Sequence, residues 1–282
     1  MRIAIASGKG GTGKTTVATN LVWTAGSTGE EVAYIDCDVE EPNGHIFLKP
    51  TIETSEKATM LYPVVDENTC SSCGKCAEIC QFKAIIMIGE YPLVFPEMCH
   101  DCGGCYEVCP AEAITMNERE IGIVEKGKQG TITFVHGMLN IGQVMSPPLI
   151  RIVKRHIPVD GVTIIDCPPG TSCPVIEAVR GSDYTLLVTE PTPFGLNDFM
   201  LTVKVIEKLG IPFGVCINRA DIGTVDTFKY CEKRFIPVHA SLPDDRRIAE
   251  VYSRGDIVAE KLPEYRKLFD ELYVSLKRKV VL

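Results

Sequence analysis

The chain has 282 residues, of which 23% are charged and 45% hydrophobic, and its formal net charge is −8. This composition is ordinary for a soluble globular protein, and the length allows one large domain or two smaller ones. No run of about 18 apolar residues is present and the N-terminus does not resemble an export signal, so we expect no membrane span and a cytoplasmic protein with reduced thiols.

The first residues predict the opening of a parallel α/β domain. An apolar run at 2–6 leads into a glycine-rich loop, a helix is expected at 15–25, and a second apolar strand at 31–35. The same alternation resumes later, with strands expected at 131–135, 161–165, 184–189 and 213–217 and helices at 147–156, 173–180, 196–209 and 246–254. We therefore predict a mostly parallel, doubly wound sheet with its ligand site at the carboxyl ends of the strands.

The glycine-rich loop has the spacing of a phosphate-binding loop, Gly-x4-Gly-Lys-Thr, at residues 8–15. Glycines let successive backbone N–H groups point at phosphate oxygens, and the following helix N-terminus favours negative charge. In such loops the lysine, here Lys14, reaches the outer phosphates, and the hydroxyl of Thr15 holds Mg²⁺. Because a strand precedes the loop and a helix follows it, a chance glycine-rich turn is a poor explanation.

A segment of different character, residues 62–116, interrupts the α/β pattern. It contains two copies of the spacing Cys-x2-Cys-x2-Cys-x3-Cys, which is typical of ferredoxins with two [4Fe-4S] clusters, where the fourth cysteine of each run ligates the other cluster. The expected ligands are Cys70, Cys73, Cys76 and Cys109 for one cluster and Cys99, Cys102, Cys105 and Cys80 for the other. Two tetrahedral zinc sites are the alternative, but three thiolates crowded on one turn suit a cubane face better.

The same segment carries most of the net charge of the chain. It has eight acidic and two basic residues, which disfavours nucleic acid as a partner. The charge suits docking to a basic patch on a redox or cluster-accepting protein, and simple solubility is the alternative explanation. Near the C-terminus, apolar residues at helical spacing between 265 and 276 predict a last helix packed on the core rather than one lying on a membrane.

The phosphate loop also carries a family resemblance. The run Lys9-Gly10-Gly11-Thr12-Gly13-Lys14-Thr15-Thr16 resembles the deviant Walker A sequence of the MinD/ParA-like ATPases, a group that includes the nitrogenase iron protein and the Mrp iron–sulfur carriers. The resemblance implies a nucleotide-dependent homodimer in which Lys9 reaches the partner's nucleotide.

Further positions follow from the resemblance alone. It implies that Asp38 orients the attacking water, that Asp166 holds Mg²⁺ through water, and that the Gly170 N–H contacts the γ-phosphate. It also implies that Asn218 helps hold adenine, and Pro243 is expected to border the base. Since residues 218–221 read Asn-Arg-Ala-Asp, which is also a guanine-reading pattern, GTP stays open beside ATP.

We therefore expect a P-loop ATPase domain at 1–61 and 117–282 and an inserted ferredoxin domain at 62–116. Its cofactors would be ATP, Mg²⁺ and two [4Fe-4S] clusters, and the nucleotide state of a dimer would control electron transfer to a protein partner. An ATPase for iron–sulfur assembly or carriage is one alternative, although the C-terminal Cys-x2-Cys of Mrp carriers is absent. A MinD-like positioning ATPase is the other. Cys173, three residues beyond Gly170, is a candidate functional thiol.

Overall fold

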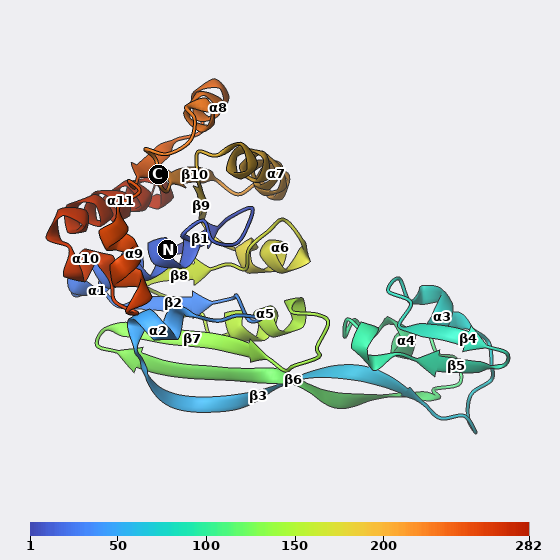
Figure 1. The fold of residues 1–282 in the computed structure, drawn as a ribbon. Coiled ribbons are helices and arrows are strands. Elements are labelled where there is room, and N and C mark those ends of the chain that lie inside the picture. Colours follow the sequence, from blue (N-terminus) through green and yellow to red (C-terminus); the bar gives the residue numbers. More distant parts are fainter. Residues whose placement is uncertain (282) are drawn as a thin grey trace.

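The computed structural model describes residues 1–281, and its centre is a nine-stranded sheet in the order β11-β10-β9-β1-β8-β2-β7-β6-β3 (Figure 1). The strands from β11 to β7 are parallel, β6 runs antiparallel to β7, and β3 runs antiparallel to β6. The parallel strands are β1 (Arg2–Ala6), β2 (Val32–Asp36), β7 (Ile132–Leu139), β8 (Val162–Asp166), β9 (Tyr184–Thr189), β10 (Phe213–Ile217) and β11 (Val238–Ser241). The predicted mostly parallel α/β sheet is confirmed.

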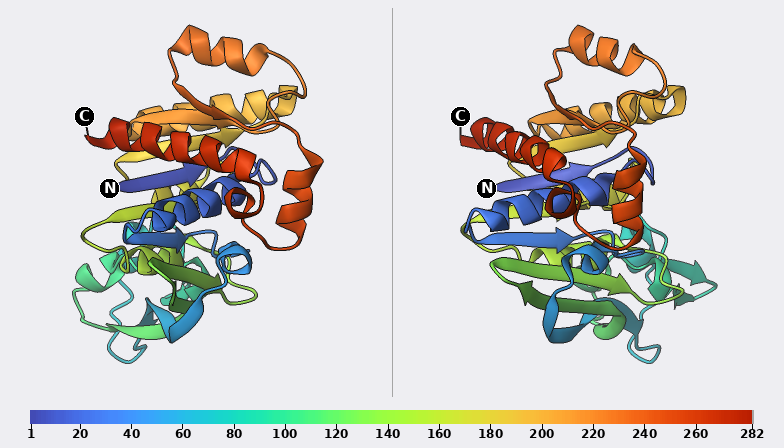
Figure 2. Two further views of the ribbon diagram at one scale, coloured as in Figure 1. Left: turned by 90° about the vertical axis from the view of Figure 1, so that its left-hand side faces the viewer. Right: turned by 60° about the vertical axis from the view of Figure 1, so that its left-hand side comes forward.

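Helices cover both faces of this sheet (Figure 1, Figure 2). Alternate residues of each strand point to opposite faces, so that Ile3 and Ile5 enter one core while Ala4 and Ala6 enter the other. The first core includes α1 (Lys14–Ser27), α2 (Gly44–Leu48), α9 (Arg246–Ser253), α10 (Val258–Lys261) and α11 (Pro263–Val281). The second includes α5 (Pro147–Lys154), α6 (Cys173–Val179), α7 (Pro193–Leu209) and α8 (Asp226–Arg234).

The C-terminal helix α11 packs on the first core. Phe269, Leu272 and Leu276 are fully buried there, so the prediction of a packed last helix is confirmed. Among residues 1–281, no helix is long and apolar enough to cross a membrane.

Two long strands, β3 (Thr51–Val65) and β6 (Ile114–Gln129), form an antiparallel ribbon at one edge of the sheet. Gly122 of β6 lies opposite Leu139, the last residue of β7, so residues 114–121 extend past the carboxyl edge of the parallel strands. The ribbon therefore projects from the edge of the sheet where the phosphate loop also lies, and the predicted borders at 62 and 116 fall inside it.

The ribbon carries residues 66–113, here called the cysteine module, at its far end (Figure 1). This module contains α3 (Lys75–Ile79), the hairpin of β4 (Ile85–Ile88) and β5 (Tyr91–Val94), a 3-10 turn (Pro96–Met98) and α4 (Gly104–Glu107). Although the module follows β2 in the chain, β7 and β6 lie between β2 and β3 in the sheet. Strand β2, which ends at Asp36, therefore does not pair with the strand β3 that leads into the cysteine module.

Candidate functional site

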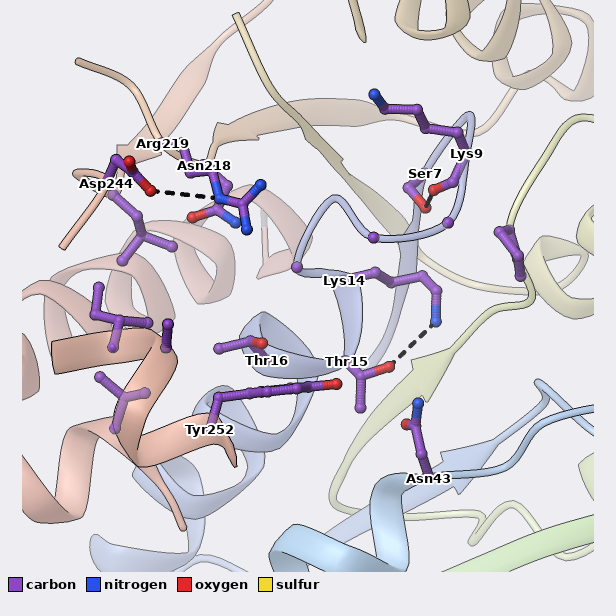
Figure 3. Close-up of a pocket in the computed structure, with 18 of the residues that line it drawn as sticks. Ser7, Lys9, Lys14, Thr15, Thr16, Asn43, Asn218, Arg219, Asp244 and Tyr252 are labelled. Atoms are coloured by element: carbon purple, nitrogen blue, oxygen red, sulfur yellow. Dashed lines mark hydrogen bonds and ion pairs between the residues drawn. The ribbon is translucent and has the colours of Figure 1, made fainter. Parts of the chain in front are cut away.

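A cavity of about 350 Å³ lies beside the loop that joins β1 to α1 (Figure 3). This volume is within the range of small-molecule sites. Most of the nucleotide-site residues expected from the sequence line it, namely Lys9, Gly10, Gly11, Gly13, Lys14, Thr15, Thr16, Asp38, Asn218 and Pro243. The others lie next to this lining: Thr12 belongs to the same loop, Asp166 contacts Lys14, and the Gly170 N–H donates to the Ser7 carbonyl at 2.9 Å.

The conformation of the loop depends on glycine. Gly11 and Gly13 have φ angles of 79° and 91°, in the left-handed region that side chains disfavour. A Cβ on Gly13 would lie 2.3 Å from the Asn218 Nδ2 atom, and that amide donates a hydrogen bond to the Thr12 carbonyl at 2.9 Å. Asn218, at the end of β10, thus braces the phosphate loop from the side.

Lys14 is the cation at the centre of the site. Its Nζ atom lies 2.5 Å from Asp166 Oδ1 and 3.9 Å from Asp38 Oδ2, and its side chain is buried. Burial disfavours the ammonium form, but the attraction of Asp166 and Asp38 outweighs burial, so the pKa of Lys14 is raised. Tyr34 donates to Asp166 Oδ2 at 2.8 Å, which leaves that carboxylate held between a cation and a phenol.

Two further carboxyl groups, those of Asp36 and Asp38, lie near Lys14. Asp36 is fully buried and accepts the backbone N–H groups of Asp38 and Gly44, each at 3.1 Å. Burial, together with the charge of Asp166, raises the pKa of Asp36 to about 8. Burial also raises the pKa of Asp38 to about 6, and Lys14 opposes that shift. The site therefore concentrates acidic groups around one lysine, an arrangement that a bound cation would stabilise.

Lys9 points away from Lys14 (Figure 3). Its Nζ atom lies 3.5 Å from Glu190 Oε2, and the other oxygen of Glu190 accepts from Arg219 at 2.8 Å. About a third of the Lys9 side chain is exposed. The ammonium group is thus held at the mouth of the cavity rather than over its phosphate loop.

Part of the cavity lining was not anticipated from the sequence. It includes Arg219, Ile248, Ala249 and Tyr252, and the last three come from α9. Their helical spacing is also that of residues packed on a core, so the sequence offers no distinct signal for them. Asp221 is not among the residues that line the cavity, and its Oδ1 atom accepts the Asp244 N–H at 2.6 Å.

Two smaller cavities lie in the cysteine module. One is lined by Cys70, Cys73, Cys76 and Cys109, and the other by Cys80, Cys99, Cys102 and Cys105. These are the two ligand sets expected from the sequence, including the exchange of the fourth cysteine between the runs.

The thiols that line each cavity do not converge on one point. Within residues 1–281, no three His, Cys, Asp or Glu side chains converge closely enough to hold one metal ion. Zinc would need sulfur atoms about 2.3 Å from a common centre. Four thiols line each cavity, and apolar residues such as Val65 and Met87 lie beside those of the first, so each set offers sulfur ligands of the kind that iron–sulfur clusters use. Of the other five cysteines, Cys173 is exposed, and Cys37, Cys167, Cys216 and Cys231 are buried.

The parallel sheet with a phosphate-binding loop at its carboxyl edge defines a P-loop nucleotide-binding protein. The family model of the CobQ/CobB/MinD/ParA nucleotide binding domain matches residues 3–258, and the chain belongs to this family.

Relatives and solved structures agree with this assignment. An uncharacterized protein of Methanocaldococcus jannaschii is 31% identical over 282 residues, which covers 98% of this chain and 96% of the relative. A second from the same organism is 30% identical over 259 residues, covering 91% and 90%. The septum site-determining protein MinD of Pyrococcus horikoshii, complexed with Mg-ADP, has a TM-score of 0.61 at 22% identity and covers 98% of this chain and 95% of that chain. A ParA family ATPase of Chlorobium tepidum has a TM-score of 0.57 at 12% identity, covering 98% of each. At these identities the solved structures show the fold alone.

Proposed function

We propose that the chain is a MinD/ParA-type ATPase in which the nucleotide state of a homodimer controls electron transfer through two [4Fe-4S] clusters. The observation that carries this proposal is the pair of cavities in the cysteine module, each lined by one complete set of four cysteines. The ribbon of β3 and β6 joins these cavities to the sheet that holds the phosphate loop.

In the nucleotide site, Lys14 would neutralise the outer phosphates, while Thr15 and Asp166 would hold Mg²⁺. Asp38 would orient the attacking water. Lys9 would act on the nucleotide of the other subunit, where it would stabilise charge that develops in the transition state. Support for this last role comes from the direction of its side chain, away from its own phosphate loop (Figure 3).

ATP is favoured over GTP as the nucleotide. A guanine-reading aspartate must present its carboxylate to the base, whereas Asp221 accepts a backbone N–H and lies outside the cavity lining. Asn218 and Pro243 would border the adenine instead. The complex of the Pyrococcus horikoshii protein with Mg-ADP supports the same choice.

The cysteine thiolates would hold the clusters, which supply one-electron transfer when bound. The acidic surface of the module suits a protein partner with a basic patch. A positioning ATPase is the second candidate, because septum site-determining MinD proteins share the fold. An ATPase for cluster assembly is distinguished by clusters that are labile and transferable rather than reversibly reducible.

Iron analysis of anaerobically purified protein tests the proposal. We expect a brown protein with about eight irons per chain. Cys109→Ser should selectively lower the occupancy of the first cluster, whereas Cys173→Ser, at an exposed cysteine outside both cavities, should keep all the iron. Stoichiometric zinc without visible absorbance would contradict the proposal.

A further inference from the structure

We propose that the outer face of the β4–β5 hairpin is the docking surface for a basic redox protein, and that electrons pass between this partner and the cluster of the first cavity, that of Cys70, Cys73, Cys76 and Cys109. The inference rests on the proposed function, because it assigns different roles to the two clusters. The first cluster would face the partner, and the second would face the body of the chain.

The pairing of β3 with β6 shows which of the two cavities lies nearer the sheet. Val65 and Ile114, which pair at the tip of the ribbon, line the first cavity, while Pro63 and Met116, which pair two residues nearer the sheet, line the second. Two residues along a strand correspond to about 7 Å. The second cavity is therefore the one closer to the nucleotide-binding domain.

A further contact fixes the second cavity to the ribbon. Cys99 Sγ lies 3.7 Å from the carbonyl oxygen of Leu61, which is two residues closer still to the sheet. Nearby, Arg119 of β6 lies 3.7 Å from Glu97 of the module. The second cavity thus lies beside the part of the ribbon that is nearer the sheet, whereas the first lies at the tip of the ribbon, next to Met87 and Pro92 of the β4–β5 hairpin.

The β4–β5 hairpin has apolar residues on both of its faces. Met87 and Pro92 pair with each other on the inner face and line the first cavity. On the outer face Ile88 pairs with Tyr91, and Leu93 follows, with exposed fractions of 57%, 55% and 42%. A sheet face that meets water ordinarily carries polar side chains, so an apolar outer face on an isolated two-stranded hairpin indicates a surface that a partner covers.

The charge around this face specifies the partner. All eight acidic residues of 62–116 are exposed, among them Glu90 in the hairpin turn, and only two basic residues accompany them. Within the described residues, only Glu97 of these eight makes an ion pair. A protein with an apolar centre and a basic rim complements such a surface. A second copy of this acidic hairpin would be repelled.

The transfer itself is a one-electron step. Cys70, Cys73, Cys76 and Cys109 would hold the group that supplies the electron, one electron would pass from it to the oxidised haem or iron–sulfur centre of the partner, and no bond would form or break. A low-potential one-electron donor restores the reduced state, and dithionite takes this role in the experiment. Because the hairpin alone separates the outer face from the first cavity, docking there brings the partner within one sheet layer of that cluster.

Cytochrome c, a basic haem protein, serves as the probe at low ionic strength. Tyr91→Lys should weaken binding of oxidised cytochrome c by about tenfold and slow its reduction by the dithionite-reduced protein by a similar factor. Reduction of a small neutral quinone should be unchanged. Tyr106→Lys, the same substitution at a tyrosine of α4 that is 52% exposed and lines neither cavity, and Phe235→Lys on the body should each have less than about a third of that effect.

Equal effects of Tyr91→Lys and Tyr106→Lys, or no effect of either, would overturn the docking surface. So would a change in sedimentation of the Tyr91→Lys variant alone, because it would show that a second copy covers the hairpin. These outcomes differ from failure of the proposed function, which would appear as protein without reducible iron–sulfur clusters in electron paramagnetic resonance before any cytochrome is added.

Discussion

Asp36 on β2 lies in register with His136 on β7. This pair belongs to a row of residues that crosses the sheet from the nucleotide site to the ribbon. On the other side of Asp36 the same row contains Asp166 of β8. His136 continues it to Glu125 of β6, with 2.9 Å between His136 Nε2 and Glu125 Oε2. A line of polar residues therefore connects the carboxylate that pairs with Lys14 to the strand that carries the cysteine module.

Helix α2 lies over this row. The Gly44 N–H donates to Asp36, and the ring of His45 packs edge-on against that of His136 at 5.5 Å between centroids. Because α2 follows the loop of Asp38, a displacement of that loop on nucleotide binding would move α2 against His136 and its contact with Glu125. This gives the nucleotide site a physical route to β6 that does not need a direct covalent link.

Replacing His136 tests that route. His136→Phe keeps a ring beside Phe134 and His45 but removes the contact with Glu125. Iron content and nucleotide affinity should stay close to wild type, while any nucleotide-dependent shift in cluster potential should fall by about half or more. His239→Phe, which alters a histidine on β11 at the far end of the sheet, should leave the shift intact. An undiminished shift in His136→Phe would rule out the route.

The charge of Lys14 should be essential for both binding and stability. Lys14→Ala leaves Asp166 buried without its cation, and losing one member of a buried pair costs about 3–5 kcal/mol of unfolding free energy. Mg-ATP affinity should fall by about 100-fold, since charged hydrogen bonds to phosphate are lost. Calorimetry and urea denaturation measure the two effects. Lys57→Ala, which breaks an exposed ion pair with Glu120, should change neither by more than about 1 kcal/mol.

Lys9 should matter only in the assembled state. Lys9→Ala should bind Mg-ATP to the isolated chain with near-normal affinity, because its ammonium group contacts Glu190 rather than the phosphate loop. It should lose nucleotide-induced dimerisation in sedimentation and, with it, ATP turnover. Lys204→Ala, at an exposed position of α7, is the control. Normal dimerisation and hydrolysis by Lys9→Ala would show that the lysine has no role across subunits.

The raised pKa of Asp38 predicts a pH-dependent stability of the nucleotide-free protein. Its pKa is about 6 in the folded chain, against an ordinary value of 3.8, so the folded state binds the proton more tightly than the unfolded state. The stabilisation is complete below pH 4 and is lost as the pH rises through 6. Relative to wild type, Asp38→Asn should therefore gain on the order of 2 kcal/mol of unfolding free energy between pH 4 and pH 7. A difference independent of pH would contradict this assignment.

Much of the architecture is readable from local sequence patterns. The bounds of β1, β9 and β10 agree with the apolar runs at 2–6, 184–189 and 213–217, because these strands are buried on both faces and their sequences are continuously apolar. The cysteine spacing likewise predicts which thiols surround each cavity, since a short spacing allows few arrangements.

The ribbon of β3 and β6 and the row of polar residues across the sheet could not be predicted from local sequence patterns. Residues 51–57 of β3 are exposed at the edge of the sheet, so their sequence carries no alternation that marks a strand. The contact of Tyr34 with Asp166 and that of His136 with Glu125 depend on register between strands far apart in the chain. No local pattern encodes that register, and such contacts emerge only once the strands are paired.

The central claim, that nucleotide state controls the redox behaviour of the cysteine module, is tested most directly by redox titration monitored by electron paramagnetic resonance. The protein is titrated without nucleotide, with Mg-ADP and with a non-hydrolysable ATP analogue, and Lys14→Ala is treated in the same way. We predict that the ATP analogue alone shifts the midpoint potential of at least one wild-type cluster by about 30 mV or more, half of the 59 mV that corresponds to a tenfold change for one electron. Lys14→Ala should show no shift. Identical wild-type potentials in all three nucleotide states would contradict the claim.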